Sequence, residues 1–196
     1  PFRYINGFSL KCDKKEASTL ERLLGRKHLI EKSDVICIPE VVSGYSQVQE
    51  KPKLTLSNLS MIGVYEAQEF TFGEGAKIGI ADTGIDYEHV EFAGAIEGGY
   101  DFVSEKERAE DDHDHGTSVA GIIAGFSTGI IPKCKIYPLK VLDKSGLGNR
   151  VDILHSIEYS IDHNLDVINL SLGSPSQWKT EVDLLRTAVR KGLIIV

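Results

Sequence analysis

Residues 111–125 read DDHDHGTSVAGIIAG, and the change of character within this stretch decides how the chain folds. Acidic and imidazole side chains crowd its first five positions. Apolar side chains then recur at the spacing of one helical face, at Val119, Ile122, Ile123 and Phe126. His115 therefore stands where a loop becomes a helix, and an imidazole on a rigid element suits a general base.

The acidic half of this stretch has two other readings. A solvated acidic loop would account for Asp111, Asp112 and His113. A metal site that supports hydrolysis would use His113 and His115 on one face of an extended segment. That second reading is weakened because no other His/Cys cluster in the sequence completes a set of ligands.

A second informative stretch lies upstream, at residues 76–86, and reads AKIGIADTGID. Residues 78–81 are small and apolar, as in a strand that is buried on both faces, and the run ends at Asp82. The carboxyl end of a buried parallel strand is where open α/β sheets place their ligands and chemistry. Considered alone, Asp82 could equally belong to a turn or a helix cap.

Three motifs taken together resemble the subtilisin-like serine proteases (subtilases) in order and approximate spacing. They are ADTGID at 81–86, HGTSVAG at 115–121 and NLSLGSP at 169–175. The resemblance implies that Asp82 is the orienting acid and His115 the general base of an Asp-His-Ser triad. It further implies a serine endopeptidase that acts on protein or peptide substrates through an acyl-enzyme, needs no cofactor for its chemistry and is secreted.

The family's serine motif has no counterpart here apart from residues 116–118, which belong to the histidine motif. We therefore expect the serine and the oxyanion asparagine to lie beyond Val196, in the remaining C-terminal part of the catalytic domain. The 196 residues alone are then expected to be inactive. The alternative function is a catalytically inactive pseudoprotease or a regulatory binding module with the same fold.

Two further segments are implied to bind substrate. Gly146, Leu147 and Gly148 follow a strand predicted at 136–142, and a glycine-bearing edge lets a substrate backbone pair closely. The resemblance implies that Ser171, Leu172 and Gly173, at the end of a strand predicted at 165–172, form the second substrate-binding strand.

Glu91 stands where many subtilases have an aspartate that can bind calcium. The following loop, residues 124–135, is shorter than the family loop that supplies most of the other ligands. Structural calcium is therefore doubtful, and a solvated Glu91 is the favoured interpretation.

The N-terminal residues 1–42 read as a small α+β unit. We predict a strand at Phe2–Leu10, a helix at Lys14–Leu24 and a strand at Val35–Ile38. The unit resembles the C-terminal half of a subtilase propeptide, a chaperone and inhibitor whose tail enters the cleft as an added strand. Residues 43–60 read as a polar linker with a maturation site, for which Tyr45 is one candidate.

Residues 61–196 read as the N-terminal part of the catalytic domain. Further helices are predicted at 61–70, 151–163 and 182–191, the last with Leu185, Ala188 and Val189 facing inward. Strands and helices that alternate from Lys77 onward predict an α/β fold, a parallel sheet with helices on both faces that later sequence completes. Asp82, His115 and Ser171 would then meet at the carboxyl edge of that sheet.

Composition narrows the classes of partner. The formal net charge is −7 with Lys and Arg interspersed, which argues against nucleic acid. No run of eighteen apolar residues predicts a membrane span. Cys12, Cys37 and Cys134 lack zinc spacing; Cys12 and Cys37 could pair, although free thiols are the commoner outcome.

Overall fold

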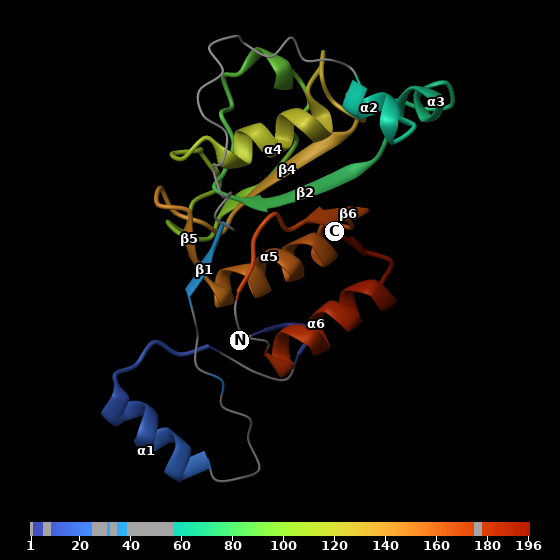
Figure 1. Ribbon diagram of the computed structural model, residues 1–196. Helices are drawn as coiled ribbons and strands as arrows, with labels where there is room; N and C mark the ends of the chain where they lie inside the picture. Colours follow the sequence, from blue (N-terminus) through green and yellow to red (C-terminus); the bar gives the residue numbers. More distant parts are fainter. Residues whose placement is uncertain (1, 6–8, 25–30, 32–34, 39–56, 175–177) are drawn as a thin grey trace.

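A five-stranded, wholly parallel sheet forms the centre of the molecule (Figure 1), in the order β3-β4-β2-β6-β7. The computed structural model describes residues 2–5, 9–24, 31, 35–38, 57–174 and 178–196. The strands of the sheet are β2 (Lys77–Asp82), β3 (Tyr100–Asp101), β4 (Lys135–Lys140), β6 (Val167–Asn169) and β7 (Ile194–Ile195).

Helices cover both faces of this sheet, as the alternating pattern predicted. In Figure 1, α4 (His115–Ala124) lies on one face, and α5 (Arg150–Asp162) and α6 (Lys179–Arg190) lie on the other. The fold is therefore the expected α/β class. Within the described part of the chain, no helix combines the length and apolarity that crossing a membrane requires.

Strand β2 is buried on both faces because its side chains alternate between two cores. Ile78 and Ile80 pack toward α4, whereas Ala81 joins the core on the side of α5 and α6. Gly79 also faces that second core, where a Cβ would lie 3.1 Å from Leu165 Cδ1. Packing on both sides fixes the register of β2 and so fixes where Asp82 emerges.

The buried face of α4 matches the predicted one only in part: Val119 and Ile123 are partly buried against the core, but Ile122 and Phe126 are not. Gly116, Ala120 and Ala124 are its buried residues, whereas Ile122 is 60% exposed and Phe126, beyond the end of the helix, is 81% exposed. The helix lies so close to the turn after β2 that only small side chains fit between them. Close approach rather than apolar periodicity therefore selects the face.

The inward face of α6 is also offset from the prediction. Leu184 and Ala188 are buried, one helical turn apart, and Leu185 is only partly buried. Val189, which we expected to face inward, is 59% exposed. The contacts of α6 with α5 and β7 select the stripe that contains Leu184.

The N-terminal residues form fewer strands than predicted. Helix α1 (Lys14–Leu24) and strand β1 (Val35–Cys37) are present, but no strand occurs among the described residues of 2–10. The amide groups of Arg3 and Tyr4 instead donate to the Glu158 carboxylate, which replaces a neighbouring strand as their acceptor.

Strand β1 pairs far from its own neighbours in the sequence. It runs antiparallel to β5 (Leu147–Asn149), which leads into α5 (Figure 1).

The predicted linker is helical at its end. Helix α2 (Ser57–Met61) begins inside the 43–60 range, and residues 43–56, including Tyr45, lie outside the described residues. Gly63, at φ +73, then turns the chain into α3 (Val64–Gln68), and its amide donates to the Ser60 carbonyl. The glycine ends the first short helix because the left-handed conformation is accessible to it without strain.

The three thiols are free. Cys12 and Cys37 are exposed and do not pair with each other, whereas Cys134 is buried. Burial raises the pKa of Cys134 to about 11, so its thiol stays protonated at neutral pH.

The packing of α4 predicts opposite effects for two alanine substitutions on the same helix. An added Cβ at Gly116 would lie 2.2 Å from the Gly84 carbonyl oxygen, whereas a Cβ at Gly121 meets nothing within 4 Å. In the full-length protein, Gly116→Ala should lower the free energy of unfolding by about 1–3 kcal/mol. Gly121→Ala should raise it by about 1 kcal/mol through helix propensity. Equal urea midpoints for the two variants would contradict the close approach.

Candidate active site

Asp82 is the last residue of β2 and its side chain is fully buried. Its Oδ1 accepts a hydrogen bond from the Thr83 amide at 2.7 Å. Its Oδ2 is buried and has no hydrogen-bond partner among the described residues. A buried carboxylate with one orphaned oxygen is costly to maintain, which marks Asp82 as a functional candidate rather than an ordinary turn residue.

His115 is the first residue of α4, as the sequence predicted. The chain enters the helix through Asp114, whose φ of +76 turns the backbone sharply. The Nδ1 atom of His115 lies 2.7 Å from Asp82 Oδ1. The nitrogen donates in this bond because an ionised carboxylate can only accept. The imidazole is 28% exposed, so the ring is held on one side and accessible on the other.

The loop before His115 does not have the geometry that a shared metal site would need. The left-handed turn at Asp114 breaks the extended segment that would have put His113 and His115 on one face. Their rings lie 6.4 Å apart and nearly perpendicular. Among the described residues, no three His, Cys, Asp or Glu side chains are grouped to hold a metal ion.

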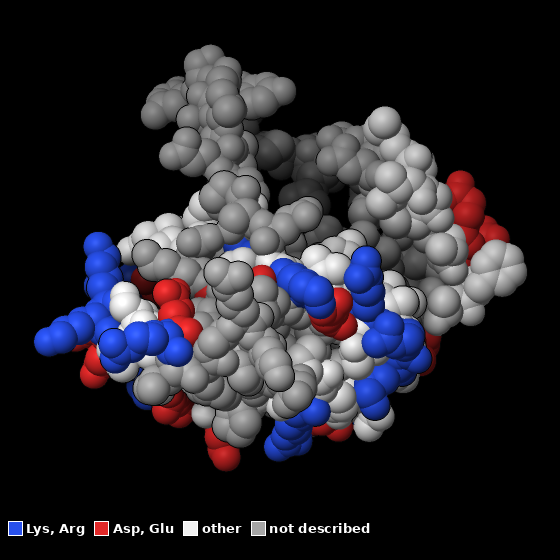
Figure 2. Space-filling view, turned by 90° about the horizontal axis from the view of Figure 1, so that it is seen from below, with Lys and Arg blue, Asp and Glu red and all other residues white. Residues whose placement is uncertain are grey.

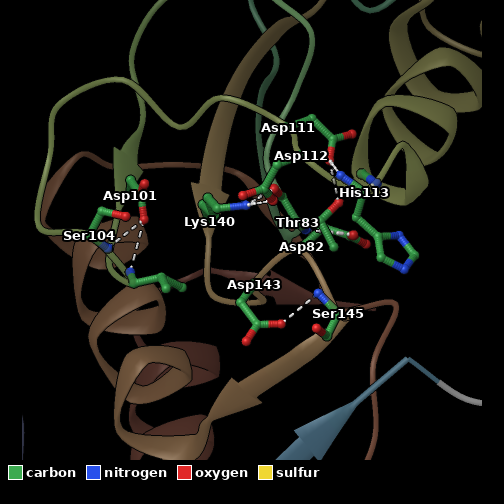
Figure 3. Close-up of polar contacts among 12 residues, drawn as sticks. Asp82, Thr83, Asp101, Ser104, Asp111, Asp112, His113, Lys140, Asp143 and Ser145 are labelled. Atoms are coloured by element: carbon green, nitrogen blue, oxygen red, sulfur yellow. Dashed lines mark hydrogen bonds and ion pairs between the residues drawn. The ribbon is translucent and has the colours of Figure 1, made fainter.

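Asp111 organises this loop, which corrects its interpretation as a solvated acidic residue (Figure 3). Its Oδ1 accepts from the amides of His113 and Asp114 and from the Thr83 hydroxyl, at 2.8 to 3.1 Å. Its Oδ2 accepts from the amide and hydroxyl of Thr117, in the first turn of α4. One carboxylate thus fixes both the loop and the start of the helix.

Thr83 connects the two halves of the site, and sequence analysis missed this role. Its hydroxyl donates to Asp111 and accepts a hydrogen bond from the Gly116 amide at 2.9 Å. Gly116 follows His115 and Thr83 follows Asp82, so the neighbours of the two candidate residues are bonded to each other. A hydroxyl directly after a strand-end aspartate was the only signal in the sequence.

The predicted substrate-binding glycines lie around the N-terminal strand β1. Gly148 pairs with Ile36, and the Ile38 amide donates to the Gly146 carbonyl at 3.1 Å. On the other side, Gly173 and Cys37 exchange two backbone hydrogen bonds of 3.3 and 3.1 Å. Residues 36–38 therefore lie between the two predicted substrate-binding segments, and Leu147 pairs with Cys37.

Gly146 leaves no room for a side chain in this region. Its φ is +69, and a Cβ there would lie 2.9 Å from Ile38 Cδ1 and 3.4 Å from His113 Nε2. His113, also read as part of a solvated loop, therefore stands beside the groove that holds residues 36–38.

Ser171 and Leu172 lie less directly on the groove. Leu172 packs against the core, and the Ser171 hydroxyl accepts from Asn169 Nδ2 at 2.8 Å. Neither forms a hydrogen bond with residues 35–38 in the described part of the chain.

Glu91 is accessible to solvent, and it also serves the fold. Its carboxylate accepts from the hydroxyl and amide of Ser127, at 2.6 and 2.8 Å. These hydrogen bonds lower the pKa of Glu91. Glu91 thus ties the 3₁₀ turn η2 (Val90–Phe92) to the segment that follows α4.

These features define a class of protein. A carboxylate at the end of a parallel strand orients an imidazole, and two further segments pair with an extended chain between them, as in hydrolases that use an Asp-His pair. The chain belongs to the subtilase family: the model of the subtilase family, peptidase S8, matches residues 73–196.

Individual relatives agree with this assignment. The chain is 31% identical to subtilisin amylosacchariticus of Bacillus subtilis subsp. amylosacchariticus, over 99% of this chain and 49% of that protein. It is 37% identical to the minor extracellular protease Epr of Bacillus subtilis (strain 168), over 71% of this chain and 22% of that protein. The crystal structure of a cold adapted subtilisin-like serine proteinase matches at TM-score 0.60 and 30% identity. The match covers 64% of this chain and 46% of that one.

The first of these relatives is about twice as long as the aligned region. The chain therefore spans about half the length of the subtilisin that it matches from end to end.

The Asp111 network predicts an acid-sensitive contribution to stability. Burial raises the pKa of Asp111, but hydrogen bonds from Thr117, Thr83 and the backbone outweigh burial and lower it from 3.8 to about 2. Because the folded-state pKa is the lower one, the contribution is complete above pH 4 and is lost as the pH falls to 2. Asp111→Asn should lower the free energy of unfolding at pH 7 by about 1 kcal/mol, after allowance for screening.

Urea unfolding of the full-length protein between pH 7 and pH 2 checks this expectation. The difference in the free energy of unfolding between wild type and Asp111→Asn should narrow as the pH falls. The control is Asp114→Asn in the same exposed loop, which should unfold near the wild-type midpoint at pH 7. A gap that stays constant with pH would contradict the assigned role of the carboxylate.

Proposed function

We propose that this chain is the N-terminal part of a subtilisin-like serine endopeptidase in which Asp82 and His115 are two members of the triad. The observation that carries the proposal is the 2.7 Å hydrogen bond between His115 Nδ1 and a fully buried Asp82. In this proposal the serine and the oxyanion donors come from sequence beyond Val196. The length of the relatives, about twice the aligned region, supports this arrangement.

Asp82 acts by orientation and charge. Its carboxylate holds the His115 ring in the tautomer that carries a proton on Nδ1, which leaves Nε2 as the basic nitrogen. When His115 becomes a cation, the buried Asp82 charge stabilises it at short range in a medium of low dielectric constant. The hydrogen bonds of Thr83 and Asp111 hold the turn after Asp82 against the start of α4, and so keep the Asp82 and His115 side chains in position.

His115 then moves the proton through both halves of the reaction. Nε2 takes the proton of the serine hydroxyl while the serine oxygen attacks the peptide carbonyl carbon. When the C–N bond breaks, the imidazolium gives that proton to the leaving amine, and an acyl-enzyme remains. Water then attacks the ester with His115 as base again, which releases the acid and restores the serine.

The groove around β1 supports a peptide as the substrate. Gly146, Gly148 and Gly173 present backbone groups that already pair with an extended chain, and such pairing is independent of side-chain identity. Protein or peptide substrates fit this mode of binding. No cofactor is needed for the proposed chemistry, and an extracellular location is supported by relatives such as the extracellular protease Epr.

The face shown in Figure 2 gives no support to a nucleic-acid partner. Basic and acidic side chains are intermixed on it rather than sorted by sign. The net charge of −7 points the same way.

We propose that residues 1–42 are a propeptide-like inhibitor and chaperone, 43–60 a linker with the maturation site, and 61–196 part of the catalytic domain. Three contacts support the inhibitor. Residues 36–38 fill the groove between the predicted substrate-binding segments. The Glu31 carboxylate accepts from the amides of Lys179 and Thr180, at the start of α6, where the helix dipole favours an anion.

The third contact joins the first residues to α5. Phe2 stacks on His155 with ring centroids 4.8 Å apart. The amides of Arg3 and Tyr4 donate to Glu158, and both of their side chains bond to Asp162. The inhibitor unit thus contacts α5, α6 and the groove, which supports a role in stabilising these elements as well as in blocking them.

Covalent labelling tests the proposed chemistry. The full-length protein, freed of residues 1–42, should form a single fluorophosphonate adduct on a serine beyond Val196, located by mass spectrometry. His115→Ala should abolish labelling. Asp82→Asn should lower kcat by roughly 10⁴-fold, a loss taken from known triads, subtilisin's included.

A folded full-length protein that forms no adduct would overturn the endopeptidase and favour the pseudoprotease. Measurable hydrolysis by residues 1–196 alone would show that the nucleophile has been assigned to the wrong part of the chain.

The inhibitor role predicts different effects for two adjacent positions on β1. Ile36 is 2% exposed and Val35 is 63% exposed. Ile36→Asp would bury an unpaired charge, so residues 35–38 should leave the groove and the uncleaved full-length protein should hydrolyse peptides roughly ten-fold faster or more. Val35→Asp should leave the rate unchanged. Equal rates for the two variants, measured with a chromogenic peptide, would contradict the inhibitor role.

A further inference from the structure

A buried lysine stands beside the candidate pair and has no part in the proposed mechanism. Lys140 is the last residue of β4 and is only 3% exposed. Lysines are almost never fully buried unless they are paired, because removing an ammonium group from water is costly. Its position therefore needs an explanation.

The ammonium group of Lys140 has two partners, and each belongs to a different half of the site (Figure 3). Nζ donates to the carbonyl of Thr83, the residue that follows Asp82, at 2.5 Å. It also donates to Asp112 Oδ1 at 2.6 Å, in the loop that leads to His115. One cation thus connects the turn after β2 with the loop before α4.

The sheet brings Lys140 to this place. Asp82 and Lys140 are register partners at the ends of β2 and β4. The amides of Val141 and Leu142, directly after Lys140, both donate to the Asp82 carbonyl, at 2.9 and 3.2 Å. The backbone of Asp82 is therefore held by β4, and the next carbonyl by the Lys140 side chain.

Charge gives the lysine a second effect. Asp82 is buried with one carboxylate oxygen that lacks a hydrogen-bond partner among the described residues. Asp112 is exposed at about half of its side chain, so its own charge is better screened by water than that of Asp82. As the register partner of Asp82 on the adjacent strand, Lys140 places a buried cation at the strand end beside the one that carries this carboxylate.

We propose that Lys140 is a positioning residue for the Asp82–His115 pair. By bonding to the Thr83 carbonyl and to Asp112, it fixes the turn and the loop on which the two candidate residues stand. This inference rests on the proposed function and adds a residue that acts through others rather than on substrate. The neighbouring Asp112 is its partner, which also corrects the interpretation of Asp112 as a merely solvated side chain.

The test compares Lys140→Met with Lys135→Met in the full-length protein. Lys135 lies at the opposite end of the same strand, where its Nζ reaches the Gly94 carbonyl on the surface. Lys140→Met should lower kcat roughly ten- to hundred-fold with KM nearly unchanged, because misplacement of the pair affects the chemical step. Lys135→Met should keep the wild-type kcat.

Two further measurements separate positioning from loss of structure. Asp112→Asn should lower kcat in the same direction but less, and its combination with Lys140→Met should be less than additive. Proton NMR should show the downfield His115 Nδ1 proton in wild type and Lys135→Met, and a broadened or absent signal in Lys140→Met. If Lys140→Met does not fold, an unaffected Asp112→Asn variant would overturn the inference.

A Lys140→Met variant with wild-type kcat and an unchanged His115 resonance would also overturn the inference while leaving the proposed function intact. If the wild-type protein has no hydrolytic activity, the proposed function fails, but the His115 resonance still decides the role of Lys140.

Discussion

The close contact between the turn after β2 and the first turn of α4 is the constraint on which the site depends. Gly116 approaches Gly84 so nearly that a Cβ on Gly116 would lie 2.2 Å from the Gly84 carbonyl oxygen. The same approach lets the Thr83 hydroxyl bond to the Gly116 amide. Thr83 follows Asp82 and Gly116 follows His115, so this bond holds the Asp82 and His115 side chains within hydrogen-bond distance of each other.

Asp82 and His115 could be predicted from the sequence, but the residues that hold them in position could not. A buried strand that ends in an aspartate, and a loop that becomes a helix at a histidine, are local patterns that one chain segment reveals. The network around Asp111 joins residues from the turn after β2, the loop and α4, and only the folded chain brings these donors to one carboxylate. The same is true of Lys140, for which the sequence indicated only that it lies in a strand, at residues 136–142.

Errors in the predicted helix faces have a related cause. Periodicity counts apolar residues but takes no account of how close the helix will lie to its neighbour. In α4 the close contact selects Gly116 and Ala120 and leaves Ile122 exposed. In α6 the buried residues are Leu184 and Ala188, so the buried face lies a fraction of a turn away from the predicted one. Size and distance, which the pattern lacks, decide which of two apolar residues is buried.

The pairing of β1 with β5 carries a consequence for the order of folding. It closes a loop that contains β2, α4 and β4. The other edge of β1 pairs with Gly173, in the segment that follows β6. The entropy of loop closure alone increases only slowly with length. However, neither wall of the groove exists until the sheet has assembled around β2. Full docking of residues 35–38 therefore depends on both walls at once, and so on the sheet that connects them.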